Sequence, residues 1–184
     1  MRLEIGGEKG TLDQELQKYL KQMVELRSGI WKEMSMKNHG FAYSCIEEWF
    51  LKHGRAMGIG QLDARQKMYL RRVGKHVGFE IKQCYRNTQE AVIFDARGGK
   101  SLLQYCEGYA YPERLIPVEH AWMLIDGAVW DPTFEILNPN RGTAYFGKEF
   151  SEEEVAKHMR QTDEYGPLVN DWQRGYPLLK GEGG

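Results

Sequence analysis

Apolar residues recur at helical spacing in the first half of the chain, and this period predicts helices there. The first stripe follows Thr11 and Gln14, two residue types that form capping boxes, and it predicts a helix over about 12–27. Its apolar members are Leu12, Leu16, Tyr19, Leu20 and Met23. A second stripe predicts a helix that ends near His53 and Gly54. Its members are Phe41, Cys45, Ile46, Trp49 and Phe50.

Two more helices are expected before residue 98. A short, strongly basic helix over about 63–73 is predicted to stop at Gly74, since glycine is common just after the last helical turn. The next helix is predicted from Cys84 to Asp95. Its inward positions are Tyr85, Thr88, Val92 and Ile93.

The pattern changes from helices to strands after Gly98 and Gly99. Three segments rich in aromatic residues and other residues of high β propensity follow. They are Leu102–Tyr111, Pro117–Ile125 and Ala128–Thr133. Asp126 and Gly127, between the last two segments, are typical of a two-residue hairpin turn. We therefore expect an antiparallel meander.

One further helix is predicted after Ser151, which forms a capping-box pair with Glu154. Its inner face contains Val155, His158 and Met159, and a loose tail follows it. Helices come first and the sheet comes later, so we expect an α+β fold with N-terminal helices packed on an antiparallel β-sheet.

The length of 184 residues is typical of one domain and is sufficient to bury a core without a disulfide or a metal. We expect a single domain over 1–184. Its parts are an N-terminal helical segment (1–77), a core (78–150), and a C-terminal helix and tail (151–184).

Charge is unevenly distributed along the chain, although the formal net charge is only -1. Residues 1–50 carry 7 basic residues (Lys or Arg) and 8 acidic residues (Asp or Glu). Residues 51–100 carry 11 basic and 4 acidic residues, and residues 101–184 carry 7 basic and 14 acidic residues. The balanced total excludes a wholly basic nucleic-acid coat protein and a polyacidic tail. Positive charge is instead concentrated in the middle of the chain.

The cysteine count and the apolar runs indicate a cellular compartment. Cys45, Cys84 and Cys106 are an odd number without a repeated spacing, which favours free thiols in a reducing compartment. Residues 1–8 contain no apolar region typical of a signal peptide, and the longest apolar run, Ala121–Ile125, is far shorter than a membrane span. We expect a cytoplasmic protein with no membrane partner, in the host-cell cytoplasm if a phage encodes it.

Cys84 is the leading candidate nucleophile because it opens a predicted helix. A thiol in a first helical turn lies near the positive end of the helix dipole, and this position favours the thiolate. Lys75, Lys82 and Arg86 act in the same direction if they point toward the sulfur. Such a nucleophile also needs a base within hydrogen-bond reach and a third group that orients the base.

His120 and Asp131 supply the base and the orienting group. If Asp126 and Gly127 form a two-residue turn, the register places Trp122 opposite Asp131. His120 differs from Trp122 by two residues, so it lies on the same pleated face, diagonal to Asp131. A diagonal separation of about 7–8 Å between backbones is short enough for the two side chains to form a hydrogen bond. The position of Cys84 relative to this pair does not follow from the register.

These residues resemble the core of the transglutaminase-like superfamily of papain-like cysteine enzymes. The matching motifs are Cys84, Glu107-Gly108-Tyr109-Ala110, His120-Ala121-Trp122 and Asp131-Pro132-Thr133. Cys84 precedes Gly108 by 24 residues and His120 by 36, and His120 precedes Asp131 by 11. The resemblance covers about 78–150.

The start of the helix adds a second resemblance. The chain is similar to a group of small phage and bacterial proteins with a Cys-Tyr-x-Asn-x-Gln helix start. The matching residues are Cys84, Tyr85, Asn87 and Gln89.

The resemblance implies that Cys84 is a nucleophile, His120 a general base and Asp131 an orienting residue. It implies a cysteine-dependent amide or ester hydrolase, or an acyl transferase, that forms a thioester acyl-enzyme. The substrate would be a protein, a peptide or another amide, and no cofactor is expected. The backbone N–H of Cys84 would bind the oxyanion together with a second donor. The candidates for this second or supporting group are Gln83, Asn87 and Gln104.

Other residues that carry reactive groups have plainer interpretations. Cys106 is the rival nucleophile, but it lies in mid-strand without a helix start behind it, and Cys45 belongs to a helical stripe. Glu107 and Glu119 are interpreted as a solvated sheet edge. No metal site is expected, because the remaining histidines lack a second ligand at metal-binding spacing. They are His39, His53, His76 and His158.

The alternative function is a catalytically inactive interaction module of phage or mobile-element origin. It would bind a host protein or a nucleic acid through a basic face, with phosphate contacts that depend on salt. The plainer interpretation of this face is a solvated surface that pairs with the acidic end of the chain, and no known nucleic-acid motif accompanies it. The basic residues are Arg65, Lys67, Arg71, Arg72 and Lys75.

Overall fold

The computed structural model describes residues 11–33, 40–99, 101–113, 115–137 and 143–181. The helices are α1 (Leu12–Glu33), α2 (Ile46–His53), α3 (Ala64–Val77), α4 (Cys84–Arg97), α5 (Pro132–Leu137) and α6 (Glu152–Thr162). The strands are β1 (Arg55–Met57), β2 (Leu103–Pro112), β3 (Val118–Ile125), β4 (Ala128–Trp130) and β5 (Thr143–Phe150).

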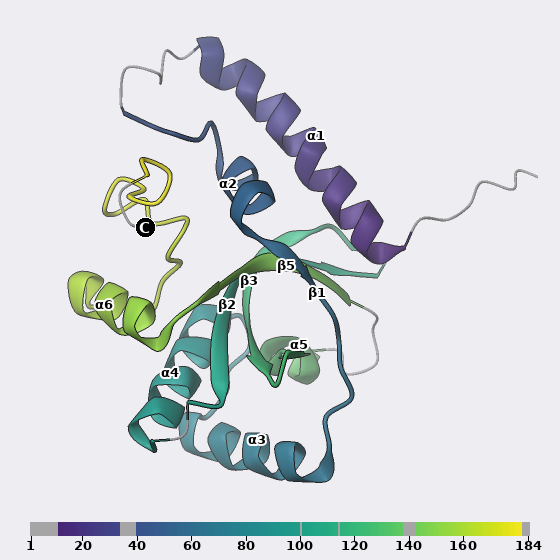
Figure 1. Cartoon of the computed structure of the whole chain (residues 1–184), viewed down its shortest axis with the longest axis vertical. Coiled ribbons are helices and arrows are strands. Elements are labelled where there is room, and N and C mark those ends of the chain that lie inside the picture. Colours follow the sequence, from purple (N-terminus) through teal and green to yellow (C-terminus); the bar gives the residue numbers. More distant parts are fainter. Residues whose placement is uncertain (1–10, 34–39, 100, 114, 138–142, 182–184) are drawn as a thin grey trace, which may run out of the picture.

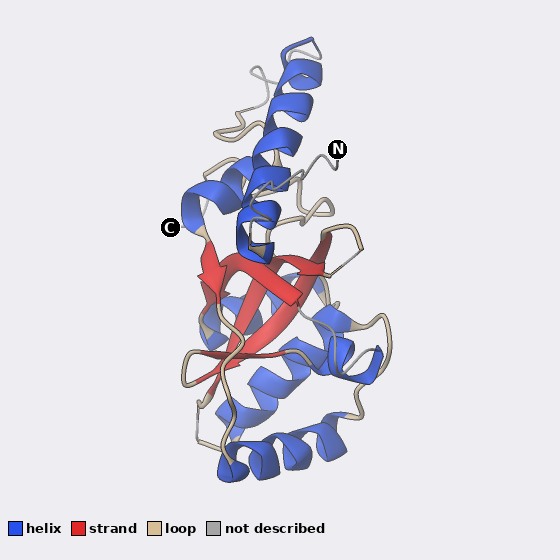
Figure 2. Cartoon of the chain, turned by 90° about the vertical axis from the view of Figure 1, so that its right-hand side faces the viewer, coloured by secondary structure: helices blue, strands red, loops and turns tan. Residues whose placement is uncertain are grey.

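The strands form one curled sheet in the order β1-β5-β2-β3-β4, and every neighbouring pair is antiparallel (Figure 1). Helices surround this sheet, with α1 and α2 near one end and α3 at the opposite end (Figures 1 and 2). The expected α+β class, with N-terminal helices on an antiparallel sheet, is confirmed.

Two strands of the sheet were not predicted. β5 pairs with the central strand β2, and β1 extends the sheet on the far side of β5. The segment 1–77 is therefore not purely helical, because β1 belongs to it. Gly108 and Gly147 face each other between β2 and β5, where a Cβ on either residue would lie 2.3 Å from a backbone oxygen of the other strand. Glycine at both positions permits this close approach.

Two predicted element boundaries were wrong for identifiable reasons. The third predicted strand stops at Trp130, and the chain turns into α5, because Asp131 before Pro132 is a helix N-cap followed by proline at the first helical position. Gly74 lies inside α3, which ends at Gly78 in the left-handed conformation with φ 68°. At Gly74, the ring of Phe79 occupies the space that a Cβ would need.

The predicted helix starts at Thr11 and Ser151 are confirmed. Thr11 and Gln14 exchange reciprocal hydrogen bonds of 2.9 and 3.3 Å, and Ser151 forms a capping box with Glu154. α1 is longer than expected and reaches Glu33, whereas α2 begins only at Ile46.

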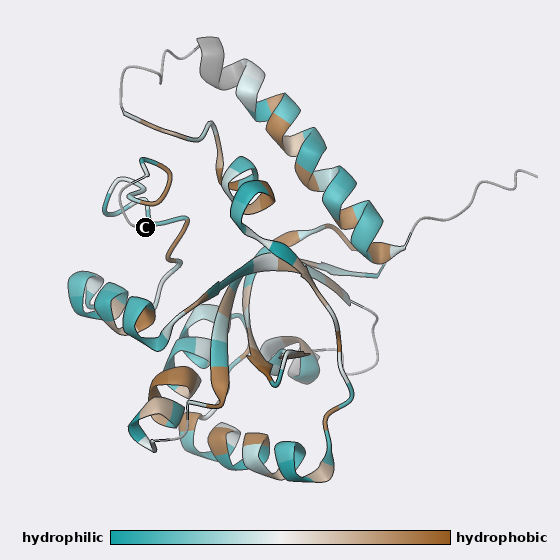
Figure 3. Cartoon of the chain, in the orientation of Figure 1, coloured by the Kyte–Doolittle hydropathy of each residue, from teal (hydrophilic) through white to brown (hydrophobic). Residues whose placement is uncertain are grey.

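The sheet packs apolar side chains on both faces. One face, with Tyr105, Ala121 and Met123, belongs to the larger core cluster, to which α1, α2, α3, α4 and α6 all contribute. The opposite face holds a smaller cluster around Trp122 and Tyr145, against which Phe134 of α5 packs. α1 and α6 are mostly hydrophilic and present only a few apolar positions to the core (Figure 3). In the described part of the chain, no helix has the length and apolar character needed to cross a membrane.

The segment after α6 is docked on the fold, so the expectation of a loose tail was wrong. Leu168, Val169 and Leu179 are buried in the larger core cluster. The buried carboxylate of Glu107 on β2 accepts the backbone N–H groups of Leu168 and Val169 at 2.7 and 3.0 Å. These two hydrogen bonds anchor the segment to the sheet.

Candidate active site

Cys84 is the first residue of α4. Asn87, one turn later, bonds both to the loop before Cys84 and to the start of α5. The side-chain amide of Asn87 donates to the backbone oxygen of Glu80 at 2.7 Å and to Thr133 Oγ1 at 3.1 Å. Its oxygen accepts the backbone N–H of Glu80 at 3.0 Å. This buried amide therefore fastens the loop before Cys84 and the start of α5 to the first turn of α4.

His120 and Asp131 form the hydrogen bond that the hairpin register predicts. β3 and β4 pair Ile125 with Ala128 and Leu124 with Val129, as expected for a turn at Asp126 and Gly127. His120 Nε2 lies 2.7 Å from Asp131 Oδ2. Both side chains are buried, with 4% and 5% of each residue exposed.

Asp131 is held by four donors. Its Oδ1 accepts the backbone N–H groups of Thr133 and Phe134 at 3.1 and 3.0 Å, as an N-cap residue does. Its Oδ2 accepts from His120 and from the hydroxyl of Tyr145 at 2.9 Å. The carboxylate is thus fixed in one orientation by α5, β3 and β5 together.

The surroundings of His120 favour its protonated form. Burial lowers the pKa of His120, but the charge of Asp131 and hydrogen bonds to Asp131 and Cys84 outweigh this effect and raise the pKa to about 9. Asp131 occupies Nε2, so Nδ1 is the ring nitrogen left to face Cys84. At neutral pH, His120 is therefore an imidazolium with a carboxylate on one side and the Cys84 sulfur on the other.

Aromatic rings fix the plane of the His120 imidazole. Phe134 stacks on it with ring centroids 4.4 Å apart and an interplanar angle of 11°. Trp122 lies nearly parallel at 6.5 Å. Trp122 itself is fully buried, and its Nε1 points at the sulfur of Met57 at 3.3 Å. The indole therefore packs the core under the site.

The three cysteines differ in exposure. Cys45 and Cys106 are buried, whereas Cys84 is partly exposed. Burial raises the pKa of Cys45 and raises that of Cys106 well above its ordinary value, which disfavours their thiolates. Cys84 therefore combines solvent access with a charged histidine neighbour.

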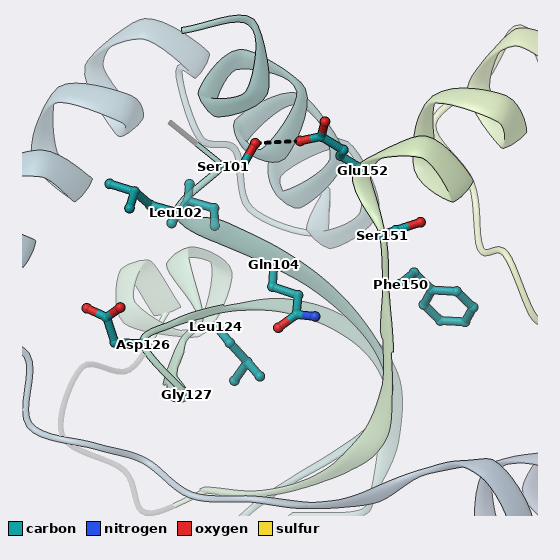
Figure 4. A pocket seen from close by; sticks show the side chains of 10 residues that line it. Ser101, Leu102, Gln104, Leu124, Asp126, Gly127, Phe150, Ser151 and Glu152 are labelled. Atoms are coloured by element: carbon teal, nitrogen blue, oxygen red, sulfur yellow. Dashed lines mark hydrogen bonds between the residues drawn. The ribbon is translucent and has the colours of Figure 1, made fainter. Parts of the chain in front are cut away.

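The three predicted supporting residues lie in different places. Gln83 is exposed directly before Cys84, and Asn87 is occupied by the structural hydrogen bonds described above. Gln104 pairs with Leu124, four residues along β2 from the partner of His120, or about 13 Å. It lines an open groove of about 560 Å³ near the β3–β4 turn (Figure 4). The structure thus does not bring Gln104 to Cys84.

The remaining histidines lie in aromatic or structural surroundings. His53 packs on Trp49, His76 stacks on Phe94, and buried His158 lies beside Asp171. His39 falls outside the described residues. Across the described ranges, no group of three or more His, Cys, Asp or Glu side chains is arranged to hold a metal ion.

Glu107 and Glu119 do not form a solvated sheet edge. Glu107 is 2% exposed, and burial raises its pKa to about 7 despite hydrogen bonds from Leu168, Val169 and Tyr105. Glu119 is half-buried and accepts from Asn170 at 2.7 Å. Both carboxylates accept hydrogen bonds from the C-terminal segment.

Two residues at this site were missed by the sequence analysis. Phe134 could have been predicted, because the Asp131-Pro132 pair is typical of a helix start. That helix places Phe134 against His120. Tyr145 had no such signal, because it reaches Asp131 only through the pairing of β5 with β2.

A scan of family models, a search of curated proteins and a search of solved structures each found no match to this chain. A functional hypothesis therefore depends on the geometry of Cys84, His120 and Asp131.

Proposed function

We propose that the chain is a cysteine-dependent amide or ester hydrolase, or an acyl transferase, with a core of the transglutaminase-like type. Cys84 is the nucleophile, His120 the general acid and base, and Asp131 the residue that orients His120. The observation that carries this proposal is the buried His120–Asp131 hydrogen bond beside a partly exposed cysteine at a helix start. A protein, a peptide or another amide is the proposed substrate.

In the first half of the reaction, the Cys84 thiolate attacks the substrate carbonyl carbon. A carbon–sulfur bond forms, and the carbonyl electron pair moves to oxygen. When this tetrahedral intermediate collapses, the carbonyl re-forms and the bond to the leaving amine or alcohol breaks. The leaving group takes a proton from the His120 imidazolium, which leaves a thioester on Cys84 and a neutral His120.

In the second half, neutral His120 takes a proton from a water molecule or an amine as that nucleophile attacks the thioester. The carbon–sulfur bond breaks, and its electron pair returns to sulfur. An acid is released if water attacks, and a new amide if an amine attacks. The thiolate and imidazolium are both restored, so no external oxidant or reductant is needed.

The start of α4 supplies donors for the oxyanion. The first four backbone N–H groups of a helix have no acceptor within the helix, and Cys84 is the first residue of α4. Its N–H is the proposed first donor, and exposed Gln83 is the proposed second. A preorganised donor of this kind typically accelerates catalysis by about 10²–10³-fold.

An activated-ester substrate tests this proposal. Incubation with p-nitrophenyl acetate should release a stoichiometric burst of p-nitrophenol and leave an acetyl group that peptide mass spectrometry assigns to Cys84. Cys84→Ala should abolish the burst and the acetyl adduct, and His120→Ala should slow acylation by about a hundredfold or more, the low end of general acid–base catalysis.

Circular dichroism provides the folding control for both variants. An acetyl group found on Cys45 or Cys106 instead would reject Cys84 as the nucleophile. An unchanged burst in Cys84→Ala would reject the proposed activity itself.

A further inference from the structure

The exposed face of α3 carries positive charge of a single sign. Five of the 14 residues in this helix are Lys or Arg, and none is Asp or Glu. All five side chains are exposed, and among the described residues none of them forms an ion pair. They are Arg65, Lys67, Arg71, Arg72 and Lys75, which we call the α3 basic face.

The helical period arranges these cations in a row. Lys67, Arg71 and Lys75 are spaced four residues apart, so successive side chains lie about 6 Å apart along the axis. Arg72 and Arg65 lie on the adjoining strip of the same exposed surface. The opposite side of the helix, with Leu70 and Val73, is buried in the core. Packing therefore fixes which side of α3 faces the solvent.

Nearby carboxylates are engaged elsewhere. Asp63 caps the start of α3 through the backbone N–H of Gln66, and Asp126 accepts from the Gln66 side chain at 2.7 Å. Asp95 lies on the buried side, where it accepts from Tyr69 and from the backbone of Leu103. These acids lie at the first turn or beneath the helix, so the cations remain available to an external anion.

The position of α3 gives an extended partner access to this face. Both orientations of the molecule show α3 at one end, with the sheet and the remaining helices on its inner side (Figures 1 and 2). The α3 basic face is therefore open to a partner that approaches from outside the molecule.

We propose that the α3 basic face binds the phosphate backbone of double-stranded DNA. This surface lies apart from the proposed reaction and does not depend on it. A row of cations without intervening acids is complementary to the regular negative charge of a duplex, and neutralising phosphates drives binding through counterion release.

The composition of α3 disfavours other classes of partner. Single-stranded nucleic acid is usually held by exposed aromatic rings, whereas Tyr69 of α3 is partly buried and bonds to Asp95, and the His76 ring stacks on Phe94. A membrane-surface helix keeps a broad apolar face for lipid, whereas the apolar face of α3 is buried in the core. Protein interfaces are depleted in lysine, and this face contains two.

Fluorescence anisotropy with a labelled duplex of about 20 base pairs tests this proposal over a range of about 50–200 mM salt. The wild-type chain should bind, with log K falling linearly as log salt rises. The triple variant Arg71→Glu, Arg72→Glu and Lys75→Glu should bind at least tenfold more weakly. Its salt slope should be shallower by about 0.9 for each lost phosphate contact.

A matched control separates the α3 basic face from net charge. Lys18→Glu, Lys21→Glu and Lys157→Glu change three exposed lysines outside α3 and should leave the affinity within about twofold, because phosphate contacts are local. Glutamine at the three α3 positions provides a milder variant in case charge reversal prevents folding, and it should also weaken binding.

Three results would overturn the proposal. They are no wild-type binding at about 50 mM salt, an equal loss in the control variant, and competition by poly-glutamate as effective as that by unlabelled duplex. The last result would indicate an acidic protein partner instead of DNA.

Discussion

His120 is a buried histidine whose positive charge is favoured by two neighbours, Asp131 and Cys84. Burial lowers the pKa of His120, and the Asp131 carboxylate, 2.7 Å from Nε2, outweighs this effect together with Cys84. Four donors from three elements hold that carboxylate in place. The contacts with Asp131 and Cys84 together thus favour the protonated form of His120.

Replacing Asp131 by asparagine removes the carboxylate charge beside His120, while His120 stays buried. We expect Asp131→Asn to lower the pKa of His120 well below about 9, because burial remains and the largest raising effect is lost. An NMR titration of the imidazole resonances measures this shift. Tyr145→Phe is the matched control, because it removes one hydrogen bond to Asp131 and keeps the charge, so the pKa should stay near 9. Equal pKa values in wild type and Asp131→Asn would contradict this account.

Glu107 is a second buried group whose ionisation affects the protein. Its pKa is raised from an ordinary value near 4.5 to about 7, chiefly by burial. The folded state therefore holds this proton more tightly than the unfolded state. The resulting stabilisation is fully present below pH 4.5 and is lost as the pH rises through 7.

We expect the free energy of unfolding of Glu107→Gln to depend less on pH than that of the wild type. Between pH 4.5 and 7, the wild type should lose about 3 kcal/mol relative to the variant, since one pKa unit corresponds to about 1.4 kcal/mol. Urea unfolding at a series of pH values measures the difference. Parallel stability curves for the two proteins would show that Glu107 does not titrate in this range.

At the scale of elements, the site combines the β3–β4 hairpin with α4, a helix that lies earlier in the sequence. The β3–β4 hairpin brings His120 and Asp131 together through its own register. The start of α4 is tied to the preceding loop and to α5 by Asn87, whose side-chain amide bonds to Glu80 and Thr133. The orientation of Cys84 therefore depends on a hydrogen-bonded junction between elements.

Asn87→Ala should disturb this junction. It leaves buried partners of the amide without a hydrogen bond, so we expect a loss of about 1–3 kcal/mol in the free energy of unfolding. Acylation of Cys84 by p-nitrophenyl acetate should slow as well, because the start of α4 is no longer fixed. Thr133→Val, which removes only the contact to α5, should have the smaller effect on both. A variant with wild-type stability and rate would show that the junction is not needed.

The helices show the same contrast between local and distant determinants. The starts of α1 and α6 were predictable, because capping boxes are formed by residues three positions apart. The end of α3 was not, since Gly74 is tolerated inside the helix where Phe79 packs against it. β1 and β5 also went unpredicted, and their pairing joins segments about 90 residues apart.

At the scale of the whole molecule, the fold pairs one part of the basic stretch with the acidic end and leaves another part exposed on α3. Arg55 of the basic middle stretch pairs with Glu149 of the acidic end, where β1 meets β5. The α3 basic face has no such partner among the described residues, which leaves it as a separate surface. The expected pairing of basic and acidic stretches therefore applies to the sheet and not to α3.

The sequence by itself determined the α+β class and the contact between His120 and Asp131. Helical and strand periods, caps and a two-residue turn act over a few residues, so local patterns specify them. Only the tertiary structure decided that Cys84 meets His120, that Tyr145 holds Asp131, and that Glu107 anchors the C-terminal segment. These contacts form when packing buries apolar faces from distant parts of the chain, and no local pattern specifies which partners that packing brings together.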